Sequence, residues 1–202
     1  MQPHSLPSRF IAELRPLWGI AWPLIIAQTA QIGTGVVDTL MAGNYSDIDL
    51  AAIAVGFNIW LPLYLVILGT LFACSAIVAQ DYGAGNIARV RSFLPQGLWV
   101  AMALSAVMTP LCLNIGSVIH LLGLADETGA KTAAYISRVG LGFPALGIFM
   151  ALRYHTQGLG ITAPFAMASV IGFLANVPLN YMLIFGVWGA PELGAEGCGL
   201  AT

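Results

Sequence analysis

The chain has 202 residues, of which 58% are hydrophobic and only 8% are charged. A soluble domain has roughly 25% charged residues, so this composition, with a mean hydropathy of +0.86, excludes a water-soluble domain. The formal net charge of −2 gives no indication of a nucleic-acid partner.

Three long segments contain no Asp, Glu, Lys or Arg, namely residues 50–80, 92–125 and 154–191. A helix needs about 20 predominantly apolar residues to cross the hydrocarbon core of a bilayer. We therefore predict an all-α polytopic membrane protein, with a cytoplasmic N-terminus at residues 1–15 and a transmembrane bundle over residues 16–202. Its helices are expected at about residues 16–42, 51–79, 93–119, 132–156 and 164–187, with a sixth beginning at about residue 197.

The distribution of charged residues predicts the orientation of these helices. If the crossings alternate, one side of the membrane receives Arg9, Arg15, Arg89, Arg91 and Arg153. The opposite side receives Asp47, Asp49, Asp126, Glu127, Glu192 and Glu196, with Lys131 and Arg138 as its basic residues. Cytoplasmic loops of membrane proteins carry an excess of Lys and Arg. The N-terminus is therefore expected in the cytoplasm.

Each apolar segment has an interior proline, and these are Pro23, Pro62, Pro110, Pro144 and Pro178. Proline removes a backbone donor and bends a helix, which a membrane helix tolerates when neighbours or water satisfy the freed carbonyl. Two interpretations are open. The prolines indicate helices that bend around a cavity, or they reflect the higher frequency of proline in membrane helices.

Polar residues form one stripe on the first predicted helix. Gln28, Gln31, Gly35 and Asp38 are spaced by three, four and three residues, so they share a face. An acid at the centre of a membrane helix costs about 2.5–3.5 kcal/mol on insertion scales. Such a residue usually marks an ion pathway or a substrate site, although Asp38 could also be the first residue in contact with water. The stripe makes Gln28 and Gln31 candidates for the wall of a cavity.

Two further pairs of residues share a helix face. Asn176 and Asn180 lie four residues apart in the fifth predicted helix. Their amides can bind neighbouring helices or offer oxygen atoms to a hard cation. Trp60 and Tyr64, one turn apart in the second helix, can line a cavity for flat cations or face lipid. A buried carboxyl with amide oxygens around it can hold either a proton or a sodium ion.

Five segments of the chain are similar in order to segments of one known family. They are residues 30–43 (AQIGTGVVDTLMAG), 49–52 (DLAA) with Gly56, 80–85 (QDYGAG) with Arg89, 176–181 (NVPLNY) and 193–202 (LGAEGCGLAT). They resemble helix 1, the start of helix 2, the loop that follows it, helix 5 and the start of helix 6 of the MATE (multidrug and toxic compound extrusion) family, particularly its NorM-type branch.

The resemblance implies the N-terminal six-helix lobe of a twelve-helix transporter, truncated at the start of helix 6. Members of the family are secondary antiporters that export cationic drugs and dyes in exchange for sodium ions or protons. The resemblance implies that Asp38 is the cation-binding acid of this lobe and that Asn176, Asn180 and Thr202 belong to its site. Some members have a second acid where Asn180 stands, so a two-acid site is not expected here.

The resemblance also implies the partners and the location. The substrates are expected to be small cationic drugs or dyes, and the C-terminal lobe of the same protein is the expected partner in the lipid bilayer of the bacterial cytoplasmic (inner) membrane. No cofactor is expected apart from the coupling ion, which is a proton or a sodium ion at Asp38. Further cation-binding acids of NorM-type proteins lie in the C-terminal lobe, so these residues do not select between the two ions.

Two rival functions are disfavoured by the sequence. A lipid-linked oligosaccharide flippase of the same superfamily lines its cavity with several basic residues, whereas only Arg138 and Arg153 lie in predicted helices here. An intramembrane aspartyl protease needs a second carboxyl near Asp38, and no other predicted helix provides one. The three cysteines are isolated and form no Cys-x-x-Cys pair, so no zinc site is indicated. We therefore expect a transporter and not an enzyme.

Overall fold

The computed structural model describes residues 6–121, 123–124 and 127–202, and this part of the chain forms α-helices and no strands. The helices are α1 (Leu6–Tyr45), α2 (Asp47–Gly83), α3 (Ile87–Leu113), α4 (Gly116–Leu121), α5 (Glu127–Gly140), α6 (Phe143–Gly158), α7 (Ala163–Phe185) and α8 (Ala195–Ala201). Part of the predicted cytoplasmic N-terminus, residues 1–5, lies outside the described residues, as does Asp126.

Among the described residues, four helices are long and apolar enough to cross a membrane: α1 from Leu17, α2, α3 and α7. Helices α5 and α6 meet the same criterion as a pair, with an angle of 47° between them. Five crossings therefore require that this bent pair spans the membrane once.

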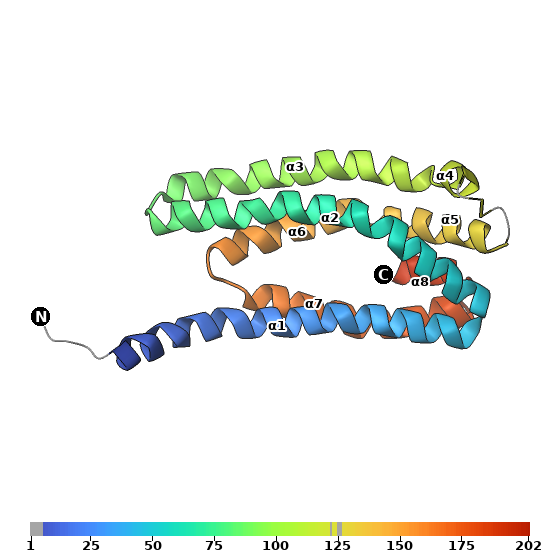
Figure 1. The fold of residues 1–202 in the computed structure, drawn as a ribbon, viewed down its shortest axis with the longest axis horizontal. Helices are drawn as coiled ribbons and strands as arrows, with labels where there is room; N and C mark the ends of the chain where they lie inside the picture. Colours follow the sequence, from blue (N-terminus) through green and yellow to red (C-terminus); the bar gives the residue numbers. More distant parts are fainter. Residues whose placement is uncertain (1–5, 122, 125–126) are drawn as a thin grey trace, which may run out of the picture.

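The helices form two layers (Figure 1). Helices α1 and α7 pack along each other in one layer, and α2, α3, α5 and α6 pack together in the other. Helix α8 contacts both layers at the end where α1 meets α2. The main core lies mostly in the second layer and includes Ile67, Leu71, Ile136 and Met150. A smaller cluster around Phe165 joins α1 to α7.

The segment predicted as one helix over residues 132–156 is two helices, so this prediction was wrong. The break falls at Leu141 and Gly142, and Pro144 lies in the first turn of α6. Proline is favoured in a first turn because its missing N–H would have no helical partner there. Hydropathy measures the apolar length of a segment and not its direction, so it could not reveal the bend.

Helix α3 satisfies the backbone at this break. Ser105 Oγ donates to the carbonyl of Phe143 at 2.9 Å, and Thr109 Oγ1 donates to the carbonyl of Gly140 at 3.2 Å. Helices α3 and α6 approach closely because Gly147 has no side chain. A Cβ atom at this position would lie 2.8 Å from Ser105 Oγ. Neighbouring hydroxyls thus make non-helical backbone tolerable at membrane depth.

The bounds of three other helices also differ from the predicted ranges. Helix α3 begins six residues before the expected position 93 and ends at Leu113, where the Asn114 side chain donates to the Pro110 carbonyl at 2.8 Å. Helix α1 extends back to Leu6 through a segment that contains Arg9, Glu13 and Arg15. Helix α2 begins at Asp47 because Ser46 caps it, with Ser46 Oγ accepting from the Ile48 N–H at 3.2 Å.

Candidate cation site

Asp38 on α1 is buried, with 6% of its surface exposed. Asn180 Nδ2 on α7 donates to its Oδ1, and Thr202 Oγ1, directly after α8, donates to its Oδ2 at 3.0 Å. Asn176 Oδ1 accepts from Asn180 Nδ2 at 2.9 Å, and Asn176 Nδ2 donates to the Ala201 carbonyl at 3.4 Å. The four residues proposed for one cation site therefore form a single hydrogen-bonded cluster.

The local structure explains how distant parts of the sequence meet here. Asn176 and Asn180 are one turn apart on α7, which packs along α1. Gly186 ends α7 in the left-handed conformation, with φ of 67°, and this reverses the chain. The Leu193 and Gly194 amides then donate to carbonyls at the end of α7 at 3.0 and 3.3 Å. The returning chain brings α8 and Thr202 to Asp38.

Asp38 has no cationic partner among the described residues, whose ion pairs are Asp81–Arg89, Asp49–Lys131, Glu127–Lys131 and Arg138–Glu196. An amide and a hydroxyl donate to its carboxyl group without supplying a positive charge. A buried carboxylate without a counter-charge is costly. A proton or a small cation would therefore be favoured at this position.

The oxygen atoms around Asp38 fit a small hard cation. Asn180 Oδ1 is buried and has no hydrogen-bond partner in the described part of the chain. The Thr202 hydroxyl has a second acceptor, the Cys198 carbonyl, also at 3.0 Å. Because a hydroxyl has one proton and two lone pairs, donation to Cys198 would leave its oxygen free to bind a cation.

No group of three or more His, Cys, Asp or Glu residues suited to a metal ion occurs among the described residues. One carboxylate with neutral oxygen atoms matches a monovalent cation or a proton better than a softer transition metal, which prefers nitrogen or sulfur ligands.

A cavity of about 1250 Å³ opens beside this cluster, between the two layers of helices. The stripe of α1 residues lines it from Gln28 through Gln31 to Asp38, and Trp60 and Tyr64 of α2 line the facing wall. Ligand pockets usually measure about 300–1,000 Å³, so the cavity is large enough for a drug-sized molecule.

The facing wall is aromatic. The Trp60 and Tyr64 rings stack with their centroids 5.0 Å apart, and Phe143 stacks on Trp60 at 6.1 Å. Such faces attract flat cations through the quadrupole of the ring. The cavity therefore combines an uncompensated carboxyl on one wall with aromatic rings on the other.

Gln28 also contacts Arg153, which the sequence analysis did not assign to the site. Arg153 Nη2 on α6 donates to Gln28 Oε1 at 3.3 Å. The Arg153 guanidinium carbon lies 3.8 Å from the centroid of the Phe165 ring on α7, a cation–π distance. Arg153 thus connects α6 to α1 and α7, ten residues along α1 from Asp38.

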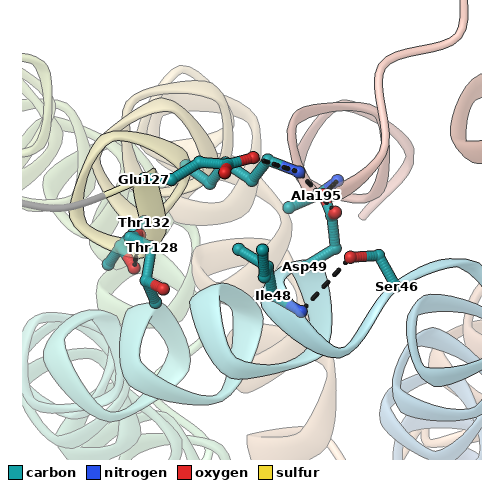
Figure 2. Close-up of polar contacts among 8 residues, drawn as sticks. Ser46, Ile48, Asp49, Glu127, Thr128, Thr132 and Ala195 are labelled. Atoms are coloured by element: carbon teal, nitrogen blue, oxygen red, sulfur yellow. Dashed lines mark hydrogen bonds and ion pairs between the residues drawn. The ribbon is translucent and has the colours of Figure 1, made fainter.

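Asp49 is buried, which the sequence did not predict. It was expected beside Asp47 on the acidic side of the membrane, just before the second predicted helix, but it lies in the first turn of α2 with 1% of its surface exposed. Its Oδ2 pairs with Lys131 Nζ at 2.6 Å. Its Oδ1 accepts from the Ala195 N–H at 2.8 Å, and Asp49 and Ala195 lie side by side in Figure 2. The missed signal is the Ser46-x-x-Asp49 pattern, which is typical of a capped helix start.

The fold and the site define an integral membrane protein of long apolar helices around a buried acid. The MatE family model matches residues 23–182, and the chain belongs to this family. Multidrug resistance protein PmpM of Pseudomonas aeruginosa is 39% identical over 201 residues, covering 99% of this chain and 42% of PmpM. A probable multidrug resistance protein NorM of Acinetobacter baylyi is 35% identical over 193 residues, covering 96% of this chain and 43% of NorM.

The chain therefore spans less than half the length of these curated relatives. A solved structure described as the outward-facing conformation of a multidrug resistance MATE family transporter aligns with a TM-score of 0.83 and 17% identity, covering 92% of this chain and 42% of that one. The predicted all-α fold of one transporter lobe is confirmed.

Proposed function

We propose that this chain forms one lobe of a multidrug efflux antiporter that exports cationic amphipathic compounds in exchange for sodium ions or protons. The observation that carries the proposal is the buried Asp38 carboxyl, which has only neutral partners and lies on the wall of a large cavity. The names of PmpM and NorM, both multidrug resistance proteins, support the same function.

A single carboxylate can couple two cations by competition. A cationic compound in the cavity and a coupling ion at Asp38 both neutralise the same charge, so each lowers the affinity for the other. A bound ion changes the conformation of the lobe only if it binds one conformation more tightly than another. Asp38 meets this requirement if its contacts with Thr202 and Asn180, which come from different helices, differ between conformations.

Either coupling ion suits the residues around Asp38. A protonated Asp38 has a hydroxyl to donate, and the buried Asn180 Oδ1 lacks a donor among the described residues. A sodium ion would instead take oxygen atoms from Asp38, Asn180 and Thr202. We therefore propose exchange with one of these ions and leave the choice to the experiment below.

The proposed location is the bacterial inner membrane. The positive-inside pattern supports a cytoplasmic position for the N-terminus and for the start of α3, where Arg89 and Arg91 lie. The Asp38 end of the lobe then lies toward the opposite side. A second lobe is the proposed partner, because the chain covers only 42% of PmpM.

The rival functions lack supporting features. A lipid-linked oligosaccharide flippase must bind pyrophosphate, but Arg138 is the only basic residue on the described cavity wall, and its Nε donates to Glu196 at 2.6 Å. An intramembrane aspartyl protease needs a second carboxyl, and the hydrogen-bond partners of Asp38 in the described chain are an amide and a hydroxyl. We therefore propose a transporter without enzymatic activity.

The test is efflux of a fluorescent cation by the full-length protein in liposomes, with sodium and pH gradients imposed separately. We expect one gradient to drive efflux in the wild-type protein and neither to drive it in the Asp38→Asn variant. Asp47→Asn is the matched control, because it makes the same chemical change at an exposed carboxyl. Gradient-driven efflux by Asp38→Asn, at equal reconstitution, would reject the proposal.

A further inference from the structure

Helix α8 connects two buried carboxyl groups. Its first residue, Ala195, donates its N–H to Asp49 Oδ1 at 2.8 Å. Thr202, the residue after its last, donates to Asp38 Oδ2 at 3.0 Å. The helix has 7 residues, a length of about 10 Å at 1.5 Å per residue. A movement at one end of so short a helix therefore moves the other end.

The Asp49 end holds α8 closely. Asp49 is 1% exposed, and Lys131 on α5 neutralises its charge. Gly194 precedes α8 with φ of +55°, and a Cβ atom there would lie 2.5 Å from Asp49 Oδ1. Only glycine adopts this backbone conformation without strain and also leaves room for the carboxylate. The start of α8 is thus fixed against Asp49 by charge, hydrogen bonding and close packing.

The Thr202 end is held less firmly. The Asn176 side chain reaches the Ala201 carbonyl at 3.4 Å, which is longer than the usual range of about 2.7–3.2 Å. The Thr202 hydroxyl can also turn to the Cys198 carbonyl at 3.0 Å. Between the two ends, Gly197 and Gly199 pack closely against Leu183 and Tyr135. Helix α8 therefore moves little within itself, and Thr202 takes its position relative to Asp38 from the start of the helix.

We propose that Asp49 is a positioning residue for the cation site, because it fixes the start of α8 and so sets Thr202 against Asp38. This inference rests on the proposed function and deepens it. It assigns a role in coupling to a residue that contacts neither the cavity nor the cation ligands. Its partners come from α5 and α8, and its role is to keep the ligand set of Asp38 complete.

The test compares four forms of the full-length protein in liposomes: wild type, Asp49→Ala, Thr202→Val and the double variant. The readout is the concentration of the driving cation that gives half-maximal efflux. For a sodium-driven protein, we expect Asp49→Ala and Thr202→Val each to raise this concentration about tenfold, the effect of losing one hydrogen bond to a charged group. For a proton-driven protein, both move the half-maximal pH upward, because a carboxylate that loses a donor binds a proton more tightly.

The double variant separates positioning from general damage. If Asp49 acts through Thr202, Asp49→Ala adds no further shift when Thr202→Val is already present, whereas independent effects add. Additive shifts, or a wild-type cation dependence in Asp49→Ala, would overturn the proposal. Glu127→Gln is the matched control, because it changes the second carboxyl near Lys131, 3.6 Å away, and leaves the Asp49 contacts in place.

Asp49→Asn provides a second test if the Asp49→Ala protein fails to fold in the membrane. Its amide oxygen can still accept from Ala195, so we expect a cation dependence within about twofold of wild type; a tenfold shift would contradict the positioning role. Hydrogen exchange of residues 195–202 in detergent is a readout that needs no transport. Faster exchange in Asp49→Ala, with no change in Glu127→Gln, supports the anchoring of α8 even if efflux is absent, and unchanged exchange overturns it.

Discussion

Asp38 and Asp49 are both buried acids of this lobe, but their surroundings differ. Asp49 has a cation, with Lys131 Nζ 2.6 Å from its Oδ2, and a backbone N–H on its other oxygen. Asp38 has an amide and a hydroxyl, which satisfy its oxygen atoms without neutralising its charge. The negative charge of Asp49 is therefore neutralised by a fixed cation, whereas that of Asp38 is not.

We propose that this difference separates a structural acid, Asp49, from an acid that exchanges cations, Asp38. A buried ion pair is costly to break, since removing one partner leaves the other charge without compensation. A buried carboxylate that has only neutral donors is stabilised most strongly when a mobile cation binds to it. Under the proposed function, a buried acid without a fixed counter-charge, and not burial alone, marks the site of ion coupling.

The largest effect is expected from Lys131→Met, which removes the counter-charge of Asp49. Breaking a buried pair costs about 3–5 kcal/mol. The Lys131 side chain is 33% exposed, so we expect a loss of about 2–3 kcal/mol in the free energy of unfolding. Unfolding of the detergent-solubilised protein, followed by tryptophan fluorescence, measures it. The double variant Lys131→Met/Asp49→Asn should recover part of the loss, and an undiminished loss would show that the charge of Asp49 is not its cause.

Thr202→Val sharpens the comparison on the Asp38 side. It removes one donor from the uncompensated carboxyl, so we expect an effect of about tenfold on cation affinity and little effect on stability. Sodium would bind more weakly, because an oxygen ligand is lost, whereas a proton would bind more tightly. The direction of the change in efflux titrations therefore identifies the coupling ion. An unchanged titration with both ions would remove Thr202 from the site.

Asp38→Asn should alter stability in the direction opposite to Lys131→Met. The substitution removes a buried charge that no fixed cation neutralises, and an amide still matches the Asn180 and Thr202 side chains. At neutral pH without sodium, we expect a gain on the order of 1 kcal/mol in the free energy of unfolding. The same unfolding assay applies. A loss of similar size would mean that Asp38 is compensated by a group outside these residues.

The smallest effect is expected from Glu127→Gln. Glu127 lies 3.6 Å from Lys131 Nζ, but its side chain is 66% exposed. Exposed pairs contribute about 0.2–1 kcal/mol. We expect a change of less than about 0.5 kcal/mol in the free energy of unfolding and normal efflux. A larger loss would show that the Lys131 pair with Asp49 depends on Glu127.

The parts of the site that follow helix periodicity could be predicted from the sequence. The spacing from Gln28 to Asp38 places these residues on one face, and the structure puts that face on the cavity. Asn176 and Asn180 likewise share a face that meets Asp38. Thr202 could be assigned only from the family resemblance, because no local pattern connects it to Asp38.

Features that depend on long-range packing could not be predicted in this way. Asp49 was predicted only on the acidic side of the membrane, but Lys131 and Ala195, which are 82 and 146 residues away in the sequence, bury it. The bend at Gly142 depends on the hydroxyls of Ser105 and Thr109, which satisfy the carbonyls around it. Hydropathy contains no information about such partners, although Pro144 and the Ser46 cap were usable local signals.

The most direct test of the central claim is the dependence of thermal stability on cation concentration, measured on the full-length protein in detergent. Sodium is varied at constant ionic strength and pH is varied separately, because a ligand that binds the folded state raises the melting temperature. We expect the melting temperature of the wild type and of Asp49→Asn to rise with one of the two cations, and that of Asp38→Asn to stay constant. A rise that persists in Asp38→Asn, or one that disappears in Asp49→Asn, would contradict the assignment of Asp38 as the exchangeable acid.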